Sequence, residues 1–155
     1  MTALLLAPCG GRICGKTLRM VKITGGYQGD LHCTATHGPS NRTLETDAPV
    51  DNQGRGETFS PTDLMATALG TCILTTMGLA ARRLGLDLKG ARFETVKEMS
   101  TDTPRRIARL TTHIWLPVPR SSDPDELLER AARTCPVHRS LHAGIDAPVV
   151  FHWKE

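Results

Sequence analysis

Two cysteines, Cys72 and Cys135, stand in the sequence surroundings most able to support chemistry. Cys72 lies in the middle of a long apolar stretch, where a single cysteine is usually a small apolar filler of a core. Cys135 directly precedes a proline, and His138 and Arg139 follow it closely. Nearby positive charge favours the thiolate that nucleophilic or redox chemistry requires. The two cysteines are therefore the first candidates for a reactive site.

The same residues also fit a second kind of site. Cys135, His138 and His142 give three potential zinc ligands at helical spacing, and Cys72 could be a fourth. The chain has no second tightly spaced pair of ligands, which is the pattern that makes a zinc site persuasive. Zinc binding is thus an alternative to thiol chemistry.

The other cysteines indicate the compartment. Five cysteines are an odd number, and their spacing is unlike a secreted disulfide framework. Cys9 and Cys14 lie in the first 19 residues, and Cys33 falls on the apolar face of an expected strand. The start of the chain has no basic residue before a short apolar run, unlike a signal peptide. We expect a cytoplasmic protein.

Composition limits the remaining classes. A chain of 155 residues suits one domain, and its 19 basic and 16 acidic residues are too scattered for a nucleic-acid surface. The uncharged stretch 64–81 reaches the length of a membrane-spanning helix. Four threonines and two glycines dilute it, and no aromatic belt flanks it. We predict a buried central helix and no membrane partner.

The N-terminal half predicts strands followed by a long helix. Residues 1–19 have no period and are expected to be an extension, disordered or a mis-assigned start, before a domain at 20–155. A strand-like run begins at Met20, residues 30–37 alternate like a half-buried strand, and 42–46 should return as its hairpin partner. Residues 47–56 are rich in turn formers and should form a surface loop.

The long helix has clear ends. Ser60, Pro61 and Asp63 form a capping box with proline in the first turn, and the helix should run to about Leu84, before Gly85. A helix that is apolar on every side needs cover on two faces, and one sheet covers only one of them. A second subunit is the natural candidate for the other face.

The C-terminal half predicts a second hairpin and two shorter helices. Residues 91–99 and 107–118 alternate like strands. Residues 122–125 should cap an amphipathic helix that Pro136 interrupts, and a short helical piece should cover 137–141. Residues 148–153 should add a last strand. This order predicts an α+β fold with an antiparallel or mixed sheet.

Two motifs resemble a known family. The sequences PTDLMATALGTC (61–72) and CPVHRSL (135–141) resemble the two cysteine motifs of the superfamily of osmotically inducible protein C (OsmC) and organic hydroperoxide resistance (Ohr) proteins. The similarity extends from about Gly25 to Trp153, and the OsmC-like branch with a poorly defined substrate is the most similar. The resemblance implies an intertwined homodimer in which sheets wrap around long central helices.

The resemblance also implies thiol peroxidase activity. In that reading the Cys72 thiolate attacks the O–O bond of an organic hydroperoxide and becomes a sulfenic acid, and Cys135 resolves it as a disulfide. A dithiol reductant would restore both thiols, and no metal, haem or flavin cofactor would be needed.

The family places a glutamate at the start of the long helix, and here the sequence departs from the pattern. Thr62 occupies that place, and the nearest carboxylate is Asp63. Asp63 precedes Cys72 by nine residues, so an ideal helix separates them by roughly 13 Å and puts them on opposite faces. Asp63 would have to act on the partner's cysteine or through another group. Helix capping alone also explains it.

The family also uses an arginine from the N-terminal half. Arg55 and Arg42 are both in that half, and Arg55 is preferred because its loop leads into the Cys72 helix. A solvated loop charge is the alternative for Arg55, and Glu57 is a possible substitute carboxylate. The changed carboxylate leaves a second function open, a small-molecule binding protein that has kept the fold and reduces no peroxide.

Overall fold

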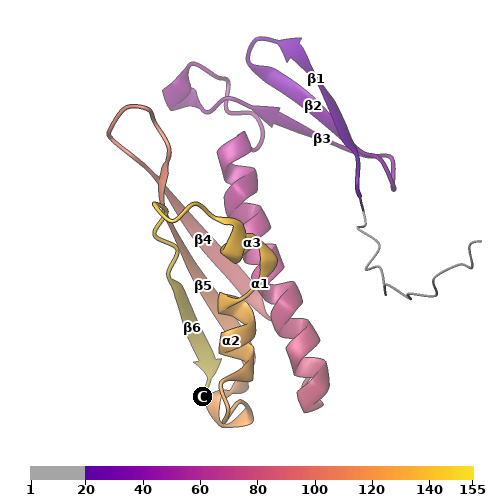
Figure 1. The fold of residues 1–155 in the computed structure, drawn as a ribbon, viewed down its shortest axis with the longest axis vertical. Coiled ribbons are helices and arrows are strands. Elements are labelled where there is room, and N and C mark those ends of the chain that lie inside the picture. Colours follow the sequence, from indigo (N-terminus) through magenta and orange to yellow (C-terminus); the bar gives the residue numbers. More distant parts are fainter. Residues whose placement is uncertain (1–19) are drawn as a thin grey trace, which may run out of the picture.

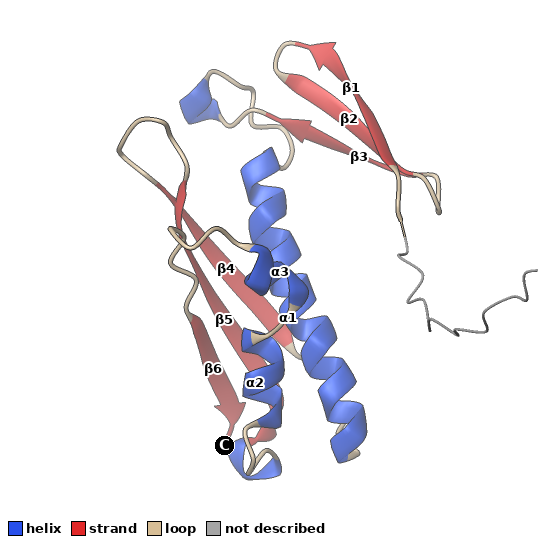
Figure 2. Ribbon diagram, viewed as in Figure 1, coloured by secondary structure: helices blue, strands red, loops and turns tan. Residues whose placement is uncertain are grey.

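The structure is a computed structural model that describes residues 20–155. The expected extension at 1–19 lies outside the described residues. The chain forms two three-stranded sheets, one long helix and two short helices (Figures 1 and 2). The predicted α+β class with antiparallel and mixed sheets is confirmed.

The first sheet has the order β1 (Ile23–Gly29), β2 (His32–His37) and β3 (Arg42–Asp47), all antiparallel. The expected start of β1 at Met20 and of β2 at residue 30 are both early. Asp30 and Leu31 have φ values of 47° and 62°, so they form the turn between the two strands instead. The apolar alternation of the sequence continues through this turn, which explains why β2 was predicted to begin too early.

Large apolar side chains of the first sheet have no cover in the single chain. Figure 1 shows this sheet apart from the helices and from the second sheet. Ile23, Tyr27 and Leu44 are all exposed, Tyr27 to 65%. Their exposure leaves apolar surface that a further protein surface could bury.

Helix α1 (Pro61–Leu84) has the predicted bounds. Ser60 and Asp63 form the capping box, and Gly85 ends the helix with a φ of 68°, a left-handed conformation that suits glycine. Leu69, Ile73 and Met77 lie on its fully buried face. The local capping signals therefore fixed both ends.

The second sheet covers this buried face. β4 (Arg92–Met99) pairs antiparallel with β5 (Ile107–Pro119), and β6 (Val149–Lys154) pairs parallel with β5. Leu110 and Ile114 of β5 are fully buried. Figure 2 shows the helices on one face of this sheet, which leaves the other face open.

Two short 3₁₀ helices complete the first part of the fold: η1 (Val50–Asn52) precedes α1, and η2 (Arg120–Ser122) follows β5. Helices α2 (Leu127–Arg133) and α3 (Pro136–Ser140) come after η2. The predicted cap at 122–125 is wrong in position, because the N-cap of α2 is Glu126 and its side chain makes no capping bond. The buried Asp123 still accepts a hydrogen bond from the amide of Leu128 at 3.0 Å. A carboxylate thus satisfies the helix amide from outside the helix.

Among the described residues, only α1 is long and apolar enough to cross a membrane by length and composition. In the single chain, 39% of its most apolar window is buried, against the second sheet and α2. The other residues of that window are half-buried or exposed, so the single chain covers this apolar helix only in part.

Gly70 sets how closely α1 approaches β4. A Cβ atom added at Gly70 would lie 2.2 Å from the Phe93 ring. We expect Gly70→Ala to lower the free energy of unfolding by about 1–3 kcal/mol, because overpacking outweighs the better helix propensity of alanine. Urea unfolding measures the change.

Gly78 provides the matched control in the same helix, since an added Cβ there meets no atom within 4 Å. Gly78→Ala should raise the free energy of unfolding by about 0.5–1 kcal/mol. Equal effects of the two substitutions would contradict the proposed role of the Phe93 contact.

Candidate active site

Cys72 and Cys135 meet beside α1. Cys72 is partly exposed on α1, and the fully buried Cys135 is the N-cap residue of α3. A hydrogen bond from the Thr76 hydroxyl to the Ala131 carbonyl, 3.2 Å long, ties α1 to α2 just before Cys135. Both thiols are free. The fold thus brings together two cysteines that are 63 positions apart in sequence.

The surroundings of Cys135 favour its protonated form. Burial raises the pKa of the Cys135 thiol above its ordinary value of 9.0, and the neighbouring Cys72 thiol raises it further. The backbone amide of His138 donates to the Cys135 sulfur at 3.3 Å and acts in the opposite direction, without cancelling the rise. Cys135 is therefore a thiol at neutral pH.

His138 contributes its backbone amide to this site, while its ring is engaged elsewhere. Its Nε2 lies 3.1 Å from the Ala147 carbonyl, which can only accept, so Nε2 carries the proton. The ring therefore anchors α3 to the segment before β6.

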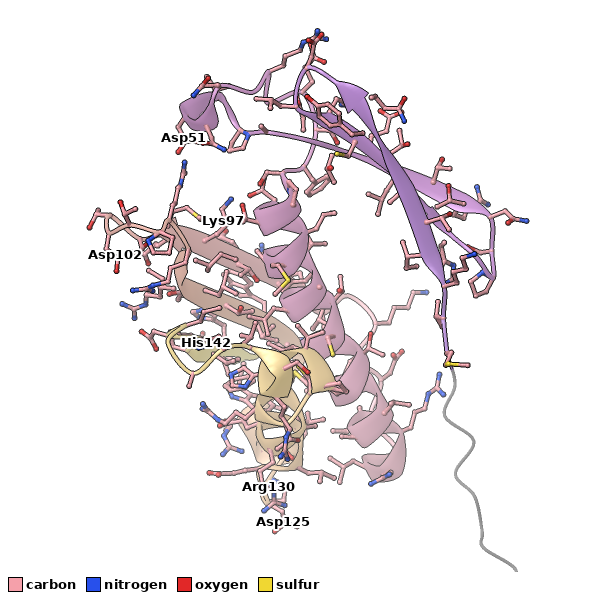
Figure 3. All side chains as sticks on the ribbon, turned by 45° about the horizontal axis from the view of Figure 1, so that its top comes forward. Asp51, Lys97, Asp102, Asp125, Arg130 and His142 are labelled. Carbon is pink, nitrogen blue, oxygen red and sulfur yellow. The ribbon has the colours of Figure 1, made fainter. Side chains whose placement is uncertain are left out.

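Asp63 and Lys97 form a second cluster at the start of α1. The Lys97 Nζ donates to Asp63 Oδ1 at 2.6 Å and to the Thr62 hydroxyl at 2.9 Å. The other Asp63 oxygen accepts from the backbone and the hydroxyl of Ser60 at 2.8 and 2.7 Å. Figure 3 shows Lys97 beside the first turn of α1.

These contacts keep Asp63 ionised. Partial burial alone would raise the pKa of the Asp63 carboxyl, but the hydrogen bonds from Lys97 and Ser60 outweigh it and lower the pKa below its ordinary value of 3.8. Asp63 therefore both caps α1 and holds a lysine of β4. Sequence reasoning missed Lys97, although a lysine on the inward side of the β4 alternation, with Phe93 and Met99, was a usable clue.

An open cleft of about 710 Å³ lies over this charged pair. Phe59, Ala66 and Phe93 give it apolar walls, and Asp63 and Lys97 are among its polar groups. Neither cysteine lines it. Within one chain the structure thus forms a thiol pair and a charged pair on different sides of α1, in agreement with the helix spacing.

The remaining candidates lie outside both clusters. Arg55 is mostly exposed and pairs with Asp30 of the first sheet at 2.7 Å. Arg42 is exposed at the start of β3. Glu57 lines the cleft, and its backbone amide donates to Asp47 at 3.1 Å. Arg55 and Arg42 therefore belong to the N-terminal sheet and its loop in this chain.

Residues 20–155 contain no group of three or more histidine, cysteine or acidic side chains placed to hold a metal ion. The spacing of Cys135, His138 and His142 suggested such a group. His138 instead hydrogen-bonds the Ala147 carbonyl, and His142 accepts from the Gly144 amide at 3.0 Å. Each of these histidines thus has a local partner at one ring nitrogen, and among the described residues neither is gathered with the cysteines into a zinc ligand set.

The lowered pKa of Asp63 gives a pH-dependent prediction. A carboxyl whose pKa is lower in the folded state stabilises folding above about pH 3.8, and this contribution disappears as the pH falls through the lowered pKa. We expect Asp63→Asn to cost of the order of 1 kcal/mol at pH 7, a small value because the side chain is 40% exposed.

Urea unfolding of the wild type and the variant at pH 7 and at pH 2.5 would measure this difference. It should be present at pH 7 and nearly absent at pH 2.5. A difference of equal size at both values would show that the charge of Asp63 is not responsible.

Comparison with known proteins places the chain among relatives. Residues 54–149 match the model of the OsmC-like protein family. No curated protein sequence is significantly similar to the chain. A solved structure from Psychrobacter arcticus 273-4, named for osmotic stress induction and a detoxification response, shares 41% identity. It covers 89% of this chain and 98% of its own, with a TM-score of 0.76.

Two more distant structures share the fold. An organic hydroperoxide resistance protein OsmC from Legionella pneumophila is 13% identical, with a TM-score of 0.73 over 88% of this chain and 99% of its own. An organic hydroperoxide resistance protein from Elizabethkingia anophelis is 14% identical, with a TM-score of 0.72 over 90% and 100%. The family match and the 41% identity together show that this chain belongs to the OsmC-like protein family.

Proposed function

We propose that the protein is a cysteine-based thiol peroxidase that reduces organic hydroperoxides. The observation that carries the proposal is the meeting of the free thiols of Cys72 and Cys135 between α1 and α3. The names of the two distant structural relatives, which refer to organic hydroperoxide resistance, support the same substrate class.

Exposure and charge assign the two roles. Cys72 is partly exposed in the single chain, whereas Cys135 is fully buried. The raised pKa of the Cys135 thiol keeps it protonated and slow to attack peroxide. Cys72 is therefore the peroxidatic residue and Cys135 the resolving residue.

The reaction balances with these two thiols and an external dithiol. The Cys72 thiolate attacks the peroxide O–O bond, which leaves a sulfenic acid on Cys72 and releases the alcohol once a proton is taken up. The Cys135 sulfur then attacks the sulfenic sulfur, which forms the disulfide and releases water. A dithiol reductant returns both cysteines to thiols and becomes a disulfide itself.

The surface around Cys72 supports a homodimer. Met65, Cys72 and Leu79 follow one another at intervals of seven residues, so they form one stripe along α1. Met65 is 41% exposed and Leu79 56% exposed. This stripe, together with the exposed apolar side chains of the first sheet, is the surface that we assign to a second copy of the chain.

The ion pair of Asp63 with Lys97 and the side chain of Arg55 have separate places in the proposal. Asp63 and Lys97 form a preassembled ion pair in the cleft, where it can face a group from the partner. Arg55, which is bound to Asp30 in its own chain, keeps its proposed catalytic role only if the dimer turns it toward a cysteine. The cytoplasmic location also belongs to this proposal.

A small-molecule binding protein without peroxidase activity is the second candidate. The observation in its favour is the apolar wall of the cleft, to which neither cysteine contributes. In that case the thiols would react slowly with peroxide, and a bound ligand would still shield the side chains that line the cleft.

Thiol counting separates the two candidates. Cumene hydroperoxide in stoichiometric amount should remove two thiols from the reduced protein within seconds and release one cumyl alcohol per disulfide. Cys72→Ser should abolish alcohol release. Cys135→Ser should allow one turnover and leave a sulfenic acid that dimedone traps.

Cys33→Ser is the matched control, because Cys33 is also free but lies in the first sheet. It should react like the wild type. Loss of activity in Cys33→Ser, or full activity in Cys72→Ser, would contradict the proposal.

The dimer has its own prediction. Leu79→Lys should shift the protein toward a monomer, because a buried lysine at an apolar interface is unfavourable. Val96→Lys is the control, since Val96 is exposed on the outward side of β4 between Glu94 and Glu98. Sedimentation velocity over a range of concentrations would compare the variants, and an unchanged dimer in Leu79→Lys would rule out this face.

A further inference from the structure

The open face of the second sheet carries a compact aromatic cluster. His113 and Trp115 of β5 and His152 of β6 stack with nearly parallel rings, and the centroids of Trp115 and His152 are 4.8 Å apart. The Nδ1 atom of His113 lies 3.0 Å from the Nε2 atom of His152. All three residues are half-buried, so their rings are partly open to solvent while their neighbours hold them in place.

The separation of the two nitrogens suits a transition-metal ion. Two cis ligands at about 2.0 Å from a square-planar ion are about 2.8 Å apart, and two ligands of a tetrahedral zinc ion are about 3.3 Å apart. The observed 3.0 Å is closer to the square-planar value. Cu²⁺ prefers that geometry with nitrogen ligands, and it binds most tightly among the divalent ions of its row.

We propose that His113 and His152 form a two-imidazole binding site for Cu²⁺ on the outer face of the second sheet, with water in the remaining positions. One facing nitrogen now carries the proton of the hydrogen bond between the rings. On metal binding this proton moves to the other nitrogen of the same ring, so both facing nitrogens become ligands.

The register places a carboxylate near this site. Glu94 of β4 pairs directly with His113 of β5, and both side chains are on the outward face. Paired side chains on one face have Cβ atoms about 5 Å apart. Glu94 is therefore a neighbouring carboxylate on the same face of the sheet, and it is not gathered with the two imidazoles as a third ligand among the described residues. The cation in the cluster, Arg92, is held over the Trp115 ring at 4.4 Å from its centroid.

The site is separate from the cysteine pair. Cys72 and Cys135 belong to the helical side of the second sheet, and they share its hydrophobic core with the buried Leu110 and Ile114. His113 and His152 alternate with these inward residues and face away from the helices. Copper binding by His113 and His152 thus does not depend on peroxidase activity at the cysteines.

Copper titration tests the proposal with reduced, untagged full-length protein. Cu²⁺ supplied as its glycine complex at half an equivalent should give an electron paramagnetic resonance spectrum with coupling to imidazole nitrogens. It should also quench the fluorescence of Trp115, which stacks on His152. His113→Gln and His152→Gln should each weaken binding at least tenfold.

His142→Gln is the matched control, because His142 is exposed and lies outside the aromatic cluster of His113, Trp115 and His152. It should bind copper like the wild type, and circular dichroism should show that all three variants are folded. The proposal would be overturned if His113→Gln and His152→Gln bound copper like the wild type. It would equally be overturned if the copper were consumed by the thiols without any nitrogen coupling.

Discussion

The cover that α1 requires determines the rest of this structure. A 24-residue helix with apolar side chains around most of its circumference must be buried on more than one side. The second sheet covers one side, and the missing side chain of Gly70 lets the Phe93 ring pack directly on the helix backbone. A second stripe at the side of the buried face, with Met65 and Leu79, remains open in the single chain. Cys72 lies in that stripe, so under the proposed function one surface would serve both assembly and chemistry.

The sequence predicted this helix well because its ends depend on local contacts. Ser60 and Asp63 are three residues apart, and their reciprocal hydrogen bonds form within the first turn. Strands β4 and β5 of the second sheet were also predicted closely, since each alternates over eight residues or more. The turn at Asp30 and Leu31 was missed, because its left-handed backbone leaves the apolar alternation intact.

The candidate site was predictable only where a motif marked it. Cys72 and Cys135 each lie in a short motif, and the fold brings them together as expected. Lys97 lies in no motif, and its contact with Asp63 joins residues 34 positions apart. Such a contact depends on how β4 is positioned along α1 in the folded chain. For the same reason the pairing of Arg55 with Asp30 could not be read from the loop sequence.

The position of Cys135 at the start of α3 links its sulfur to the capping of this helix. Its sulfur accepts the His138 amide and so replaces the hydroxyl or carboxylate that usually caps a helix. Pro136 at the first helical position needs no such partner, because it has no amide hydrogen. A sulfur in a disulfide remains a weak acceptor, so α3 can keep its cap after oxidation. If the proposed disulfide to Cys72 forms, it would therefore join α1 to α3 while the sulfur of Cys135 still caps α3.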